Sequence, residues 1–72
     1  MTKRVEISFR MTDDWFEKSE LVEKVVGRTP SGSGAGFGRR DMEWTLQEGE
    51  DARDLLLRIV KQCPFVDEIR IV

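Results

Sequence analysis

The chain has 72 residues, 39% of them hydrophobic and 36% charged, which suits one small globular domain and leaves little room for a deep active site. Twelve basic and fourteen acidic residues are interspersed and give a net charge of −2, so the strongly basic stripe typical of nucleic-acid-binding proteins is missing. There is no His and only one Cys, which excludes His-based catalysis, paired-cysteine sites and an internal disulfide.

The same observations predict a single domain over residues 1–72 in a cytoplasmic setting. No apolar run approaches the roughly 20 residues of a membrane span, and the N-terminal segment lacks the apolar core of a secretion signal. A lone cysteine fits a reducing compartment. We therefore expect no membrane partner.

The first quarter of the chain predicts a strand followed by a helix. Strict alternation over residues 3–9 is typical of a half-buried strand, whose inward face would carry Val5, Ile7 and Phe9. Thr12 is a candidate N-cap for a helix over about 13–26, and Gly27 suits its C-terminal end.

The second half predicts a strand, a helix and a strand. Residues 39–47 alternate again, with Met42, Trp44 and Leu46 on one face. The best helical pattern lies within 48–63, where Pro64 stops it, and residues 66–72 form the last strand. The apolar stripe of that helix comprises Ala52, Leu55, Leu56, Ile59, Val60 and Cys63.

Between the two halves, glycine occupies every second position from Gly32 to Gly38. A phosphate-binding loop needs a GxxxxGK[ST] or GxGxxG spacing between a strand and a helix, and neither spacing is present. A flexible linker would not keep a strict two-residue period. The pattern therefore favours a strand over about 29–35, which glycine weakens and so places at the sheet edge. A tight turn over residues 36–39 follows, in which Gly38 can take a positive φ.

With that strand included, the order of elements becomes βαββαβ. This order predicts an α+β fold, a ferredoxin-like sandwich in which a four-stranded antiparallel sheet carries two helices on one face. We expect the glycine face of the edge strand to be covered by an aromatic ring, either Trp15 or Trp44.

The stretch "GSGAGFGRRDMEW", residues 32–44, resembles a hairpin of small uncharacterised bacterial proteins of about this size. The resemblance extends over essentially the whole chain. It implies the βαββαβ plan and a bacterial origin. It implies no activity, so no catalytic residue is carried over.

The open face of the sheet is predicted to hold paired charges. In the ferredoxin-like order, Glu6 would lie near Arg70, and Arg10 would lie near Asp41 or Glu43 and near Glu68. Such a face is either a solvated charge lattice or a polar docking surface, and the sequence leaves both open.

The function predicted is non-catalytic protein binding, with another protein or a second copy of the chain as partner, as in a homodimer or a small inhibitor or immunity-type protein. An uncharged sheet edge can accept a strand from another chain. No catalytic residue, metal or cofactor is expected. The alternative is nucleic-acid or nucleotide and phosphate binding through a cluster of Arg28, Arg39 and Arg40, against which the acidic residues of the open face argue. The predicted contact residues are Ser33, Ala35, Phe37, Arg39 and Arg40.

Overall fold

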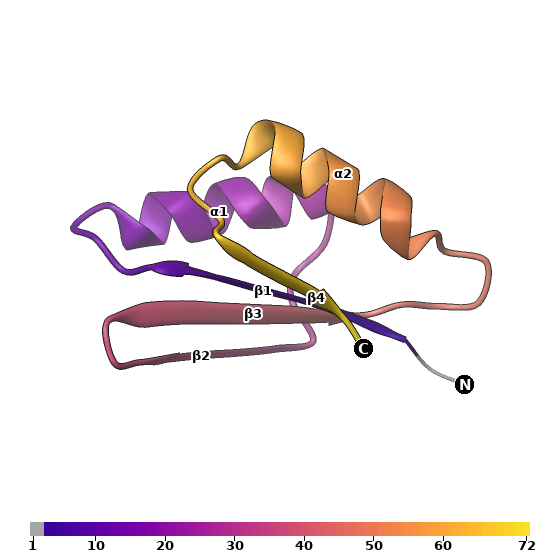
Figure 1. Ribbon diagram of the computed structural model, residues 1–72, viewed down its shortest axis with the longest axis horizontal. Helices are drawn as coiled ribbons and strands as arrows, with labels where there is room; N and C mark the ends of the chain where they lie inside the picture. The colour runs from indigo at the N-terminus through magenta and orange to yellow at the C-terminus, as the bar shows by residue number, and fades with distance from the viewer. Residues whose placement is uncertain (1–2) are drawn as a thin grey trace.

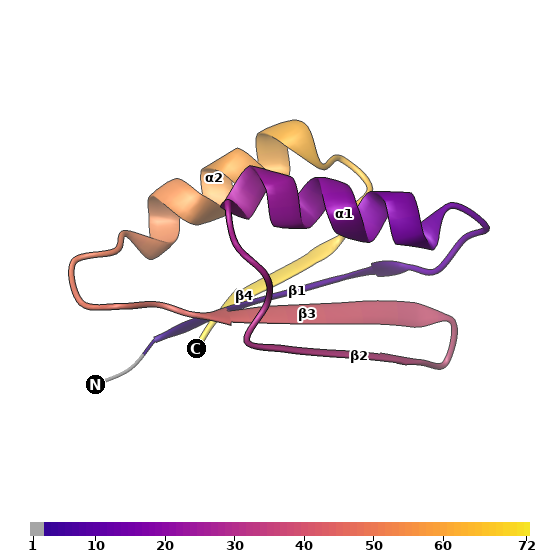
Figure 2. The same cartoon turned by 180° about the vertical axis from the view of Figure 1, so that it is seen from behind.

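The computed structural model describes residues 3–72, so residues 1 and 2 of the predicted 1–72 domain lie outside the described part. The fold is α+β, with one four-stranded antiparallel sheet and two helices, as predicted. Both helices lie on the same face of the sheet (Figures 1 and 2). In chain order the elements are β1 (Arg4–Arg10), α1 (Trp15–Val26), β2 (Gly32–Gly36), β3 (Arg39–Thr45), α2 (Ala52–Gln62) and β4 (Glu68–Ile71).

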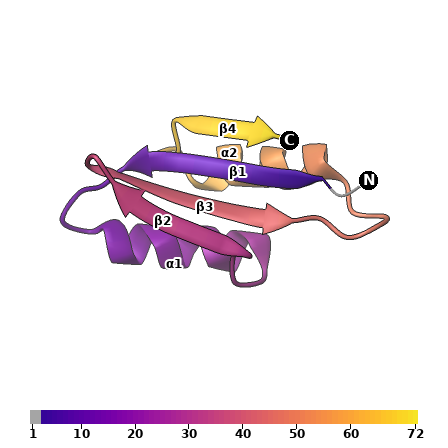
Figure 3. The same ribbon diagram turned by 90° about the horizontal axis from the view of Figure 1, so that it is seen from below.

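The strand order in the sheet is β2-β3-β1-β4, so β2 and β4 form its two edges. Figure 3 shows this order from the face that carries no helix, with α1 behind the β2–β3 side and α2 behind the β1–β4 side. The predicted glycine strand is thus confirmed as an edge strand, although it is shorter than expected.

The core lies between the sheet and the helices and comes from the residues that the alternation predicted to face inward. Trp44 is fully buried, and its indole Nε1 donates a hydrogen bond of 3.1 Å to the carbonyl oxygen of Arg28. Cys63 is also fully buried, and this desolvation raises the pKa of its thiol. The other buried apolar side chains are those of Val5, Ile7, Phe9, Val22, Met42, Leu46, Ala52, Leu55 and Ile59.

Both helices end close to their predicted bounds, but α1 begins later than predicted. Its N-cap is Asp14 and not Thr12, because the Thr12 carbonyl accepts the Trp15 N–H as part of a turn that precedes the helix. Gly27 ends α1 with φ = 92°, a conformation that glycine adopts without strain. On α2, Val60 was expected on the core stripe and is instead 52% exposed. Neither helix within residues 3–72 is long and apolar enough to cross a membrane.

β2 starts at Gly32 and not at residue 29, because Pro30 has no backbone N–H to donate to the ladder. Ser31 makes the transition into the strand. Its backbone N–H donates to the Glu43 carbonyl at 2.8 Å, and its hydroxyl oxygen accepts the Thr45 N–H at 2.9 Å.

Packing on α2 generates a stability prediction. Ile59 has no exposed surface, whereas Leu57 in the same helix is 64% exposed. Ile59→Ala is expected to lower the free energy of unfolding by about 2–5 kcal/mol, because it removes buried methylenes and leaves a cavity. Leu57→Ala should change it by no more than about 0.5 kcal/mol. Urea unfolding followed by tryptophan fluorescence measures both; equal losses would contradict this packing.

Candidate functional site

The β2–β3 hairpin closes through the shortest common connection, the two residues Phe37 and Gly38. Gly36 pairs with Arg39 across the turn. Phe37 has φ = 53° and Gly38 has φ = 73°, as a type I′ turn requires. The Gly38 carbonyl accepts a 2.7 Å hydrogen bond from the Met11 N–H, which fixes the turn to the connection between β1 and α1.

Phe37 is an unusual residue for this position. Type I′ turns prefer Asn, Asp or Gly at both central positions, since a positive φ is unfavourable for a bulky side chain. The Phe37 side chain is also fully exposed, so no packing within the domain compensates for the strain. Neither the local backbone nor the core accounts for an aromatic residue here.

Hydrogen-bond alternation determines which groups of β2 face outward. Arg4 and Val72 exchange both of their backbone hydrogen bonds, at 3.0 and 2.8 Å. Successive residues of an antiparallel strand direct their N–H and C=O groups to opposite sides. When this alternation is followed through the paired residues from β1 to β3 and from β3 to β2, the backbone groups of the β2 glycines point toward β3. The pair that closes a two-residue hairpin, here Gly36 and Arg39, is hydrogen-bonded, so it also directs the backbone groups of the glycines toward β3. The N–H and C=O groups of Ser33 and Ala35 therefore point away from the sheet.

The three glycines of β2 share the helix-free face of the sheet. The register places Gly32 opposite Glu43 and Gly34 opposite Asp41, both of which belong to that face. The expected aromatic cover is wrong: Trp44 alternates to the other face of β3 and is buried there, and Trp15 lies on α1. The register puts the glycines on the face opposite both rings.

The fold itself does not require glycine at Gly34 or Gly36. Neither residue has a positive φ, and a Cβ atom added at either position would meet nothing within 4 Å. At Gly32 an added Cβ would lie 2.6 Å from Oε1 of Glu43, the end of a flexible side chain. Neither backbone strain nor core packing therefore explains why glycine occupies these two positions.

Arg39 and Arg40 extend from the base of the turn to opposite faces of the sheet. Nε of Arg39 donates to the Ser8 hydroxyl at 3.0 Å on the open face, and its guanidinium also binds Asp67, just before β4. On the helix face, the Arg40 guanidinium lies 5.6 Å from the centre of the Trp15 ring. The two side chains therefore hold the hairpin to the rest of the domain from both sides.

The structure does not bring the three arginines of the predicted basic cluster together. Arg28 follows α1 and binds Glu50 at 2.9 Å and the Thr45 carbonyl at 2.8 Å, beyond the end of β3 that lies away from the turn. The pKa of Glu50 is lowered by the hydrogen bond from the Gln47 N–H and by the bond from Arg28. Each arginine has protein partners of its own, on a different part of the surface.

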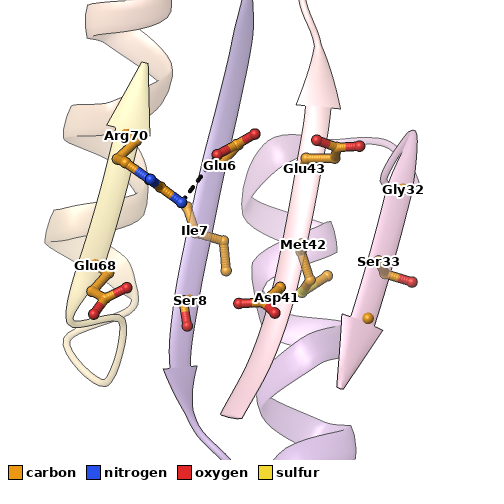
Figure 4. A pocket seen from close by; sticks show the side chains of 11 residues that line it. Glu6, Ile7, Ser8, Gly32, Ser33, Asp41, Met42, Glu43, Glu68 and Arg70 are labelled. Atoms are coloured by element: carbon orange, nitrogen blue, oxygen red, sulfur yellow. Dashed lines mark ion pairs between the residues drawn. The ribbon is translucent and has the colours of Figure 1, made fainter. Parts of the chain in front are cut away.

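The open face of the sheet holds a shallow groove of about 380 Å³ that extends from β2 to β4 (Figure 4). The charged residues that line it are Glu6, Asp41, Glu43, Glu68 and Arg70, and β2 contributes Gly32, Ser33 and Gly34. The predicted pairing of Glu6 with Arg70 is confirmed, at 3.5 Å.

The pairing predicted for Arg10 is wrong. The register places Arg10 opposite Arg39 and gives Ser8 as the partner of Asp41. Glu43 instead lies 3.9 Å from Arg4, between Nη1 and Oε2. These pairs make part of the open face a satisfied charge lattice.

The five predicted contact residues meet at one hairpin but play different parts. Ser33 and Ala35 present backbone groups at the edge, and Phe37 presents a free aromatic side chain. Arg39 and Arg40 are half-buried and internally bonded. Sequence reasoning missed Ser8 and Asp67 as the partners of Arg39, since nothing local indicates a pairing across three strands.

Comparison of the chain with protein-family models, curated proteins and solved structures finds no match. The functional argument therefore rests on the geometry of the hairpin.

The glycines generate a prediction with an internal control. Gly34→Ala is expected to raise the free energy of unfolding by about 0.4–1 kcal/mol, because alanine fits the extended backbone and has fewer conformations to lose. Gly38→Ala should lower it by about 1 kcal/mol or more, because φ is positive there. Chemical denaturation of both variants measures the difference; a destabilised Gly34→Ala would mean that the fold does need this glycine.

Proposed function

We propose that this chain is a ferredoxin-like domain that binds another polypeptide chain by accepting a strand at its glycine edge. The βαββαβ element order and the strand order β2-β3-β1-β4 support the fold assignment. The proposed role is non-catalytic and uses no metal or cofactor.

The observation that supports this function is that the edge hairpin contains residues that the stability of the domain does not favour. At Gly34 and Gly36 an added Cβ atom would meet nothing within 4 Å, and Phe37 is a strained aromatic with its whole side chain in water. Residues that break local preference without a compensating contact inside the domain tend to mark functional sites. Here they border the outward backbone groups of Ser33 and Ala35.

The chemistry of this edge suits β-augmentation. A strand added at an edge gains affinity from main-chain hydrogen bonds and specificity from side-chain contacts. β2 has no charged residue to repel an incoming strand, and its glycines leave the added backbone free of steric conflict. Phe37 supplies an apolar anchor beside the edge, of the kind enriched at binding hot spots.

Arg39 and Arg40 support this site without being its main contacts. Their guanidinium groups already bond within the domain, so their part is to hold β3 and the turn in place for the edge strand. The same bonds, and the separate location of Arg28, argue against the alternative of phosphate or nucleic-acid binding, because the three arginines do not converge.

Amide exchange tests the availability of the edge. In dilute, monomeric protein, the amides of Ser33 and Ala35 should exchange rapidly, because their N–H groups face water. The amide of Gly34, bonded to β3, should be slower by at least about tenfold. NMR-detected hydrogen exchange resolves the alternation. Equal, strong protection at all three positions would show that the edge is already covered and would reject the proposal.

A further inference from the structure

We infer that the strand that completes the glycine edge is β2 of a second copy of this chain, antiparallel to the first about a twofold axis at Gly34. This inference rests on the proposed function and names its partner. It rests on the hydrogen-bond pattern, the shape, the charge and the apolar anchors of one short strand.

The hydrogen bonds of β2 are self-complementary about Gly34. Ser33 and Ala35, whose backbone groups face outward, lie one residue to either side of it. In an antiparallel pair centred on Gly34, Ser33 of one copy stands opposite Ala35 of the other, and each such pair exchanges two hydrogen bonds. The twofold repeats the pair, so both outward residues of each strand are satisfied. Such an isologous contact closes as a dimer.

The shape of β2 permits this approach. At the axis, Gly34 meets Gly34 of the second copy as a pair without mutual hydrogen bonds, where Cα atoms come within about 4.5 Å. No side chain of β2 projects on that face, and Ser33 and Ala35 are the only side chains of β2 that the two copies would bring together on the helix face. Both are small and exposed. The glycines of β2, which the fold of the monomer does not require, would allow the two backbones to come this close at the axis.

Charge favours β2 over the other edge of the sheet. Natural edge strands are guarded from pairing by charged side chains and by shortness. β4 fits that description: its four residues include Glu68 and Arg70, and the Arg70 side chain is 77% exposed. β2 has five residues and no charge. Of the two edge strands, β2 is therefore the one that lacks charged side chains to prevent pairing.

The register also gives Phe37 a partner. With Gly34 on the axis, Phe37 of one copy comes opposite Ser31 of the other and beside its half-buried Pro30. The twofold makes this contact twice, once at each end of the paired strands. An aromatic ring held outside its own domain thereby gains apolar cover. Because Pro30 and the turn limit the pairing to a short strand, the dimer should be reversible and depend on concentration.

A cysteine pair tests the register directly. Gly34→Cys puts a thiol on the axis, where the Cα separation of about 4.5 Å lies within the range for a disulfide. Gly36→Cys is the matched control. Its position is equally open, but the axis separates it from its own copy by four residues of strand, about 14 Å. The native Cys63 is buried, so the wild-type chain gives the background.

Under mild oxidation, Gly34→Cys is expected to form a disulfide-linked dimer at least about tenfold faster than Gly36→Cys. Equal rates for the two variants, or no linked dimer from Gly34→Cys above the wild-type background, would overturn the inferred register.

Light scattering over a concentration series separates this inference from the proposed function. The wild-type mass should rise toward that of a dimer while the Ser33 and Ala35 amides become protected. Ala35→Pro, which removes one outward N–H, should stay monomeric, whereas Ala35→Ser should dimerise. Phe37→Asn, a better turn residue, should fold at least as stably and dimerise less.

Two other outcomes contradict the inference in different ways. A wild-type chain that stays monomeric with rapidly exchanging edge amides would reject the second copy as partner and leave the available edge standing. A dimer that persists in Ala35→Pro would place the interface elsewhere on the molecule. Amides protected in the monomer would reject the proposed function itself.

Discussion

The two-residue turn at Phe37 and Gly38 is the constraint on which the rest of the site depends. Because it closes the hairpin with Gly36 opposite Arg39, it fixes the register of β2 against β3. A shift of one residue would exchange the two faces of β2, bring its glycines under the helices and direct the backbone of Ser33 and Ala35 inward. The turn therefore decides which surface the glycines leave bare.

That register separates the sheet into two kinds of strand. β1 and β3 lie in the middle, and their apolar alternate residues, such as Ile7 and Trp44, supply most of the sheet's contribution to the core. β2 adds a hydrogen-bonded layer but almost no buried side chain. The core therefore places little constraint on the composition of β2.

The sequence predicted every element and its type, because alternation and helical periodicity agree along the chain. It also identified β2 as an edge strand. It placed the tight turn at residues 36–39, as the structure has it. It could not predict the register of β1 against β3, which joins strands distant in the chain, and so it misplaced the partner of Arg10. It misplaced the aromatic cover because the face that the glycines occupy follows from their pairing with β3. The pairing of Arg39 with Asp67 was out of reach for another reason: it joins segments 28 residues apart through the tertiary fold.

The arginines at the base of the turn bear on how the edge would bind. A flexible hairpin would lose conformational entropy when a strand is added, and that loss would reduce the affinity. Here Arg39 holds β3 to Ser8 and Asp67 on one face, and Arg40 holds it to Trp15 on the other. The Met11 hydrogen bond fixes the turn itself. The outward groups of β2 are thereby ordered before a partner arrives, which favours binding by so short a strand.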